Sequence, residues 1–130
     1  MKITVDIELN LKDEELKKNL VNANRKAMRD TVVAVWSASI KPPSPRLTGH
    51  NRRSIVGEVS GLGEVRKGAD AEPDKQVNDS KLEGAVYSTS GYGGFLETGT
   101  SRMGARPYMK PALDSNFTAE KYASLVREYL

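Results

Sequence analysis

The sequence predicts an α+β fold, in which a long N-terminal helix and a C-terminal helix pack on a small, mainly antiparallel β-sheet. Apolar residues alternate with polar ones at the start of the chain and again over 55–65 and 82–89, as in half-buried strands. Over 13–41, small and apolar residues instead recur every three or four positions, which is the period of a helix. The length of 130 residues suits one domain, so we expect residues 1–130 to form a single domain.

The N-terminal pattern predicts a strand followed by the long helix. Ile3, Val5, Ile7 and Leu9 alternate with polar residues, which is typical of a strand. Asp13 suits the N-cap of the helix, because an aspartate oxygen can accept backbone N–H groups there. The buried face of this helix is expected to consist of Leu16, Leu20, Ala23, Ala27, Thr31, Ala34, Val35 and Ala38.

The middle of the chain predicts a short helix and two strands. Three prolines end the long helix, and Thr48 is then expected to cap a short helix within the stretch HNRRSI. Residues 55–65 predict a strand with a bend or bulge at its glycines, and residues 82–89 predict a second strand. We expect these strands to pair as a hairpin with the polar loop 66–81 at its tip. A loop of this length in a small domain is usually functional or mobile.

The C-terminal third predicts one helical turn and then a longer, interrupted helix. Tyr92, Phe95 and Leu96 have the spacing of one turn, which Gly99 can end. Pro107 or Pro111 suits the first position of the helix that follows. This helix is expected to break near Asn116 and restart at Thr118. Its apolar face is expected to include Leu113, Phe117, Tyr122, Leu125, Val126 and Tyr129.

The composition excludes several kinds of site. The chain has no cysteine, which excludes disulfides, thiolate metal sites and cysteine nucleophiles. The net charge of +3 permits an acidic partner without requiring nucleic acid. No apolar run approaches the roughly 20 residues that span a bilayer, and the first residues do not resemble a secretory signal. We therefore expect a soluble protein without an export signal or membrane contact.

Few residues are candidates for catalysis. His50 is the only histidine, so a multi-histidine metal site is excluded, and no GxSxG elbow supports a Ser–His–Asp triad. Glu97 lies beside apolar residues, and we interpret it as the partner of an arginine rather than as a general acid. The glycines over 61–68 and 88–94 lack the spacing of phosphate-binding loops. We expect no enzyme activity, no catalytic residue, no metal and no cofactor.

Two basic stretches, 41–53 and 102–110, leave two functions open. They contain Lys41, Arg46, Arg52 and Arg53 in the first, and Arg102, Arg106, Tyr108 and Lys110 in the second. In one groove, these residues could track phosphates and stack on bases, as in a nucleic-acid-binding module. Arginines also pair with carboxylates between subunits. We favour subunit contacts and keep nucleic-acid binding as the alternative.

Two segments resemble those of one family of phage proteins. KPPSPRLTGHNRRSI looks like the family segment "P…TG.LR.SI", although Asn51 stands where the family often has leucine. GYGGFLETGTSRMGARPYMKPAL looks like the second family segment, "YA..vE.GT…..ARPFl.PA". The chain therefore resembles the HK97 gene 10-like phage neck or tail-completion proteins, which join head to tail.

The resemblance implies a non-enzymatic structural protein of a tailed bacteriophage or prophage. Such a protein is made in the host cytoplasm and ends in the virion neck or tail. It forms a homo-oligomeric ring that docks between head-connector or head-closure proteins and tail-terminator or tail-tube proteins. The only nucleic acid expected is DNA passing through the lumen.

A ring also suits the second segment, in which glycines are expected to set the turns and Pro107 and Pro111 to stiffen the exit. A rigid corner of this kind loses little conformational entropy when it docks on a partner. The candidate subunit or partner contacts are Arg52, Arg53, Glu97, Thr98, Gly99, Thr100, Arg102, Arg106 and Tyr108. Loop 66–81 is expected to be mobile in the free subunit and ordered against a neighbour. A small hydrolase using His50 or Glu97, and a chaperone or toxin-like accessory protein encoded beside phage genes, are the remaining alternatives.

Overall fold

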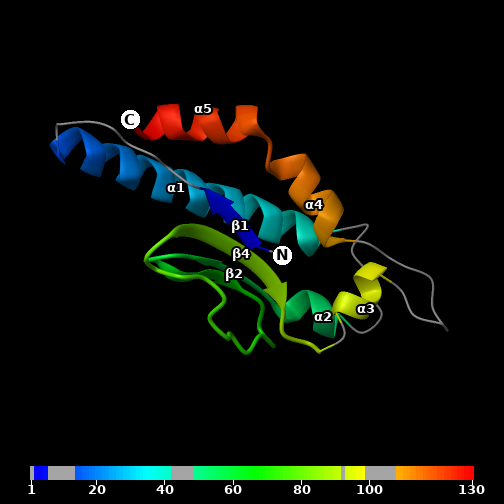
Figure 1. Ribbon diagram of the computed structural model, residues 1–130. Coiled ribbons are helices and arrows are strands. Elements are labelled where there is room, and N and C mark those ends of the chain that lie inside the picture. Colours follow the sequence, from blue (N-terminus) through cyan, green and yellow to red (C-terminus); the bar gives the residue numbers. More distant parts are fainter. Residues whose placement is uncertain (1, 6–13, 42–48, 92, 99–107) are drawn as a thin grey trace.

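The computed structural model confirms the α+β class and arranges the elements in three layers (Figure 1). The residues that the structure describes are 2–5, 14–41, 49–91, 93–98 and 108–130. A four-stranded sheet forms the first layer, and the long helix α1 (Glu14–Ser39) lies across it. Helices α4 (Met109–Asn116) and α5 (Ala119–Tyr129) lie on the side of α1 that faces away from the sheet.

The sheet is antiparallel between all neighbouring strands. Its strands are β1 (Lys2–Val5), β2 (Ile55–Val59), β3 (Gly63–Lys67) and β4 (Leu82–Ser88), in the order β1-β4-β2-β3. The predicted pairing of the two later strands is confirmed, because Ile55 lies opposite Ser88 and Val59 opposite Gly84. The predicted N-terminal strand forms one edge of the sheet. Its expected continuation, and the expected N-cap Asp13, fall outside the described residues.

The stretch 55–65 forms a hairpin, so the prediction of one bent strand was wrong. Gly61 and Gly63 have φ angles of 78° and 72°. Such left-handed glycines let the chain reverse, so β3 folds back beside β2. The expected bulge is nevertheless present inside β2, where the register shifts between Gly57 and Glu58.

Helix α1 confirms the predicted long helix, but its predicted buried face was only partly right. Ala23, Ala27, Thr31 and Val35 are buried as expected, whereas Leu16 is 46% exposed. The buried surface also includes Asn24, Met28, Val32 and Ser39. The sheet covers one side of α1 and helices α4 and α5 cover another, so more than one stripe is buried. The N-terminal turns of α1 extend beyond the sheet and remain exposed (Figure 1).

The sheet approaches α1 most closely where it carries glycine. A Cβ atom on Gly84 would lie 2.5 Å from Val32 Cγ2 and 2.8 Å from Met28 Sδ. Real Cβ atoms do not approach other atoms so closely, so a larger residue would push α1 away from the sheet.

The short helices differ from their predictions mainly at their first residues. Gly49, which has a φ of 76°, is the N-cap of helix α2 (His50–Arg53), whereas Thr48, the expected cap, lies outside the described residues. Helix α3 (Gly93–Thr98) confirms the predicted turn. Helix α4 begins at Met109, so the prediction that a proline takes its first position was wrong.

The predicted break in the C-terminal helix is confirmed. Phe117 is extended and separates α4 from α5, and Thr118 is the N-cap of α5. The Thr118 hydroxyl accepts the Lys121 backbone N–H at 3.2 Å. Tyr122 of α5 donates its hydroxyl to Asn24 Oδ1 of α1 at 2.9 Å, so the two helices are joined by a polar contact as well as by packing.

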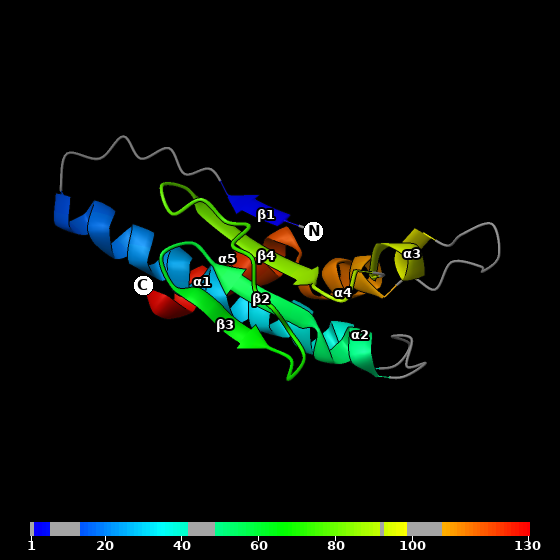
Figure 2. The same cartoon turned by 90° about the horizontal axis from the view of Figure 1, so that it is seen from below.

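The polar loop between β3 and β4 covers the face of the sheet opposite α1 (Figures 1 and 2). Val77 of this loop is buried, and the Asn78 backbone N–H donates to the Glu83 carboxylate at 2.9 Å. The Gln76 backbone N–H donates to the buried carboxylate of Glu58. The loop is therefore not the tip of a two-stranded hairpin, because β3 intervenes and the loop then crosses the sheet.

Candidate functional site

The corner between α3 and α4 is held by the carboxylate of Glu97. Its Oε2 accepts the backbone N–H groups of Tyr108 at 2.8 Å and Met109 at 3.0 Å, and its Oε1 accepts that of Lys110 at 2.9 Å. The next residue, Pro111, has no N–H. One side chain therefore satisfies the backbone donors that are otherwise left open at a helix start.

This contact keeps Glu97 ionised. Burial raises the pKa of the Glu97 carboxyl, but the three backbone donors outweigh it, and the net pKa lies below its usual value. The positive end of the α4 dipole also favours an anion at this place. Glu97 is therefore a helix-capping anion with backbone partners rather than a group poised to donate a proton. The contacts that hold Glu97 come from backbone groups and not from the arginine expected for it, while the predicted interface residues Arg102 and Arg106 lie outside the described residues.

Tyr108 fixes the same corner from inside. Its side chain is 3% exposed and its hydroxyl donates to the Gly93 carbonyl at 3.3 Å. A Cβ atom on Gly93 would lie 2.7 Å from that hydroxyl and 2.5 Å from Ser88 Cβ, so only glycine fits there. Tyr108 thus stabilises the contact between α3 and α4 and is not presented for stacking on a base.

Helix α2 is tied to the polar loop through Asp70. Asp70 Oδ2 accepts the Arg53 Nε–H at 2.8 Å and lies 3.0 Å from His50 Nδ1. Hydrogen bonds from His50 and from Arg53 hold the pKa of Asp70 below its usual value. In return, the Asp70 backbone N–H donates to the Arg53 carbonyl at 2.9 Å. Arg53, a predicted interface residue, therefore has a partner within its own chain.

His50 also lies near Ser54, which gives a Ser–His–Asp connectivity that the sequence did not reveal. Ser54 Oγ is 3.5 Å from His50 Nε2. However, Ser54 is fully buried and its hydroxyl donates to the His50 carbonyl at 2.7 Å. A nucleophilic serine has to face the substrate and donate to the imidazole. This arrangement instead joins α2 to the loop.

Asn51 is a buried polar residue whose partners come from the end of β4. Its Oδ1 accepts the hydroxyls of Ser88 at 2.6 Å and Ser90 at 2.8 Å. The two serine hydroxyls therefore satisfy the carbonyl oxygen of this buried amide. No local pattern indicated this group, because its members come from separate predicted elements.

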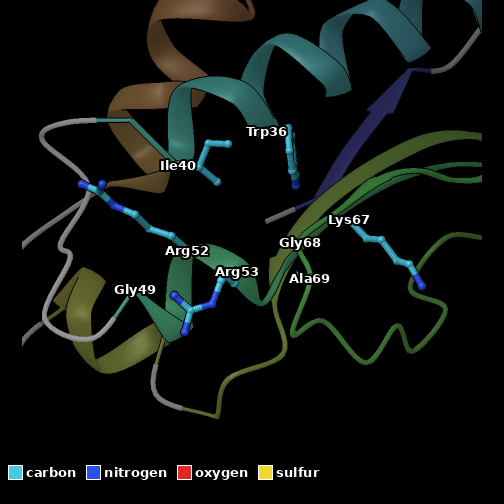
Figure 3. A pocket seen from close by; sticks show the side chains of 8 residues that line it. All are labelled: Trp36, Ile40, Gly49, Arg52, Arg53, Lys67, Gly68 and Ala69. Carbon is cyan, nitrogen blue, oxygen red and sulfur yellow. The ribbon is translucent and has the colours of Figure 1, made fainter.

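An open pocket of about 480 Å³ lies between the end of α1, α2 and the end of β3 (Figure 3). Trp36 of α1 and Ile40, which directly follows α1, form its apolar part (Figure 3). Arg52, Arg53 and Lys67 supply cationic groups around it, and we call this feature the basic pocket. The Trp36 indole N–H donates to the Ile55 carbonyl at 2.9 Å, which fixes the ring.

The structure brings together only part of the predicted interface. Arg52 and Arg53 line the basic pocket, while Glu97 and Tyr108 lie at the α3–α4 corner. Gly99, Thr100, Arg102, Arg106 and the side chain of Thr98 lie outside the described residues. Sequence reasoning missed Trp36, Lys67 and Asn51, because each acts with residues that are distant along the chain.

Neither a metal-binding cluster nor a membrane-spanning helix is found in the part of the chain that the structure describes. No group of three or more histidine, aspartate or glutamate side chains among them could hold a metal ion. None of the helices in this part of the chain is long and apolar enough to cross a membrane.

Comparison of the chain with protein-family models, with curated proteins and with solved structures finds no match. The resemblance to phage neck proteins therefore depends on the two sequence segments alone.

Proposed function

We propose that this chain is a structural component of a tailed bacteriophage or prophage, at the head–tail neck or the tail-completion ring. Copies of the chain would close into a ring and dock between head-connector and tail proteins. The observation that carries the proposal is the Glu97 clamp, because it joins the two halves of the segment that resembles the family. Glu97 comes from the "E.GT" half, and its partners Tyr108–Lys110 come from the "ARPF" half.

The clamp joins the two described ends of this segment, α3 and the start of α4. Three backbone donors and the Tyr108–Gly93 contact hold α3 against the start of α4. A surface that is already ordered loses little conformational entropy when a partner binds it. Helices α2 and α3 lie at the same end of the molecule, so the basic pocket and the corner can contact one partner together (Figure 2).

A particle-assembly assay in the encoding phage or prophage tests the proposal. Without the protein, filled heads and tails should accumulate separately in electron micrographs, and the wild-type chain should restore joined particles. Glu97→Ala should restore fewer, whereas Glu72→Ala, at an exposed loop position, should restore the normal yield. Joined particles at normal yield without the protein would contradict the proposal.

Nucleic-acid binding remains the second candidate, and the basic pocket favours it. Arg52, Arg53 and Lys67 line the same pocket as Trp36, and basic side chains beside an aromatic ring can hold phosphates next to a stacked base. DNA binding that weakens steeply with salt and is lost in Arg52→Ala would support this function. DNA binding that is absent at low salt would remove it.

A further inference from the structure

A second concave surface lies on the other side of α1, between α1 and α5. This acidic groove measures about 500 Å³. Its lining residues are Asp30, Thr31, Ala34, Asn116, Glu120, Lys121, Ser124, Leu125 and Glu128. Glu120 and Glu128 are exposed on α5 and flank the partly buried Leu125. Lys121 donates its ammonium to the Ser115 carbonyl at 2.5 Å, which holds it toward α4.

The acidic groove and the basic pocket are complementary in two respects. The pocket is lined by apolar Trp36 and Ile40 together with basic side chains. The groove is lined by apolar Leu125 and Ala34 together with three carboxylates and Lys121. Complementary charge steers association and fixes the register of two surfaces.

Some charged groups of the two surfaces are already bonded within the chain, and others are exposed to a partner. Asp30 is already bonded to the Arg29 guanidinium and the Tyr129 hydroxyl, and Arg53 is bonded to Asp70. The exposed groups that remain to define the charge of each surface are Glu120 and Glu128 in the groove and Lys67 in the pocket.

We propose that the acidic groove of one copy binds the basic pocket of the next, so that the chain assembles head to tail. This inference rests on the proposed ring function and names the contact that builds the ring. The two surfaces are different patches on the same chain, so the contact is heterologous. Repeated contacts of this kind close into a ring when the rotation between neighbours permits it.

The arrangement of the layers suits such a contact. Helix α5 lies beyond α1, on the side away from the sheet, whereas α2 lies at one end of the sheet (Figure 1). Each copy therefore offers its two surfaces in different directions and can bind two neighbours at once.

The sole tryptophan makes this contact measurable in the full chain. Trp36 is the only tryptophan and lines the basic pocket, so its emission should change as the mass from light scattering rises with concentration. Lys67→Glu and Glu128→Lys should each weaken self-association by about tenfold or more, because each places like charges together. Lys18→Glu makes the same charge change at an exposed site on α1, outside both surfaces, and should leave association unchanged.

A charge-swapped double variant provides the sharpest test. Lys67→Glu combined with Glu128→Lys in one chain should associate nearly as well as the wild type, because opposite charges again meet across the contact. Failure of this double variant to recover, with both single variants folded, would overturn the proposal. So would a wild-type chain that stays monomeric at about 1 mM, or association that leaves Trp36 emission unchanged.

These results separate the contact from the proposed function. Self-association through the two surfaces, with heads and tails that join without the protein, would retain the contact and remove the neck function. A required role in joining, with association insensitive to Lys67 and Glu128, would retain the function and remove the contact. Quenching of Trp36 by a DNA oligonucleotide, without self-association, would assign the pocket to nucleic acid and overturn the proposal.

Discussion

The core between α1 and the sheet is stabilised in a different way from the α3–α4 corner and the adjacent helix α2. In the core, fully buried apolar side chains such as Met28, Val32 and Ile55 fill the space between two regular elements. In the corner, the Glu97 carboxylate accepts hydrogen bonds from three backbone N–H groups. In α2, the side-chain carbonyl of Asn51 accepts the hydroxyls of two serines that follow β4 or end it. The core therefore depends on volume, and the corner on the position of individual oxygen atoms.

The largest effect is expected where volume is added to the core. Gly84→Val should lower the free energy of unfolding by about 3 kcal/mol, because the new Cβ would overlap Val32 and Met28. Urea unfolding followed by Trp36 fluorescence measures the change. Gly94→Ala is the matched control, because a Cβ on Gly94 meets nothing within 4 Å and should be neutral or slightly stabilising. Equal stability of Gly84→Val and the wild type would contradict the close packing.

Removing the acceptor at the corner should have the next largest effect. Glu97→Ala leaves three backbone N–H groups without their carboxylate and should cost about 2 kcal/mol. Glu97→Gln keeps one acceptor oxygen and should cost less. Loss of hydrogen-exchange protection confined to the first turn of α4 would identify the clamp as the cause. Unchanged protection of Met109 and Lys110 would contradict it.

Acid should destabilise the corner, whereas pH changes near neutrality should not, because Glu97 is already ionised there. The folded pKa of Glu97 lies below its unfolded value, so its stabilisation is present above the ordinary glutamate pKa of about 4.3. This stabilisation is lost as the pH falls through the folded pKa. As the pH falls below about 4.3, the unfolding midpoint of the wild type should therefore fall more steeply than that of Glu97→Gln. Parallel slopes would exclude Glu97 as a titrating contributor.

The exposed tie between α2 and the loop should matter less than Glu97. Asp70→Asn weakens the ion pair with Arg53 and the contact with His50, both of which are open to solvent. Water and salt screen such pairs, so the loss should be smaller than for Glu97→Ala and should shrink further at high salt. Thermal unfolding at low and high salt gives the comparison. A loss larger than that of Glu97→Ala would contradict this order.

The smallest expected effect concerns the loop over the outer face of the sheet. The backbone N–H groups of Gly68, Gln76 and Asn78 all donate within the chain. These amides should therefore exchange slowly in the free subunit, with little further change on assembly. Strong protection that appears only in the assembled state would instead support the loop mobility expected from its polar sequence.

The regular elements of the fold could be predicted from the sequence because their signals are local. The alternation around Val56 and Val86 predicted paired strands, and Thr118 marked the start of α5. The buried face of α1 was predicted only in part, since a single stripe does not describe a helix that is covered on two sides. Leu16 fits the helical period yet lies beyond the sheet.

The polar contacts of the candidate site could not be predicted, because they join residues that are far apart along the chain. No local pattern links Asn51 to Ser88, or Trp36 to Lys67. Glu97 was identified as unusual from its apolar neighbours, but its partners are backbone groups, which have no signature in the sequence. Side-chain types indicate what a group can bind, and only the folded chain decides which donors reach it.

The position of β1 in the sheet has a consequence for synthesis. Val5 lies opposite Leu82 and Ile3 opposite Gly84, so the ribosome has to add about 80 residues before β1 meets its partner strand. At roughly 5–20 residues per second, this takes about 4–16 seconds. During that interval β1 lacks its partner strand β4. A chaperone that holds this segment would therefore act on the order in which the sheet forms.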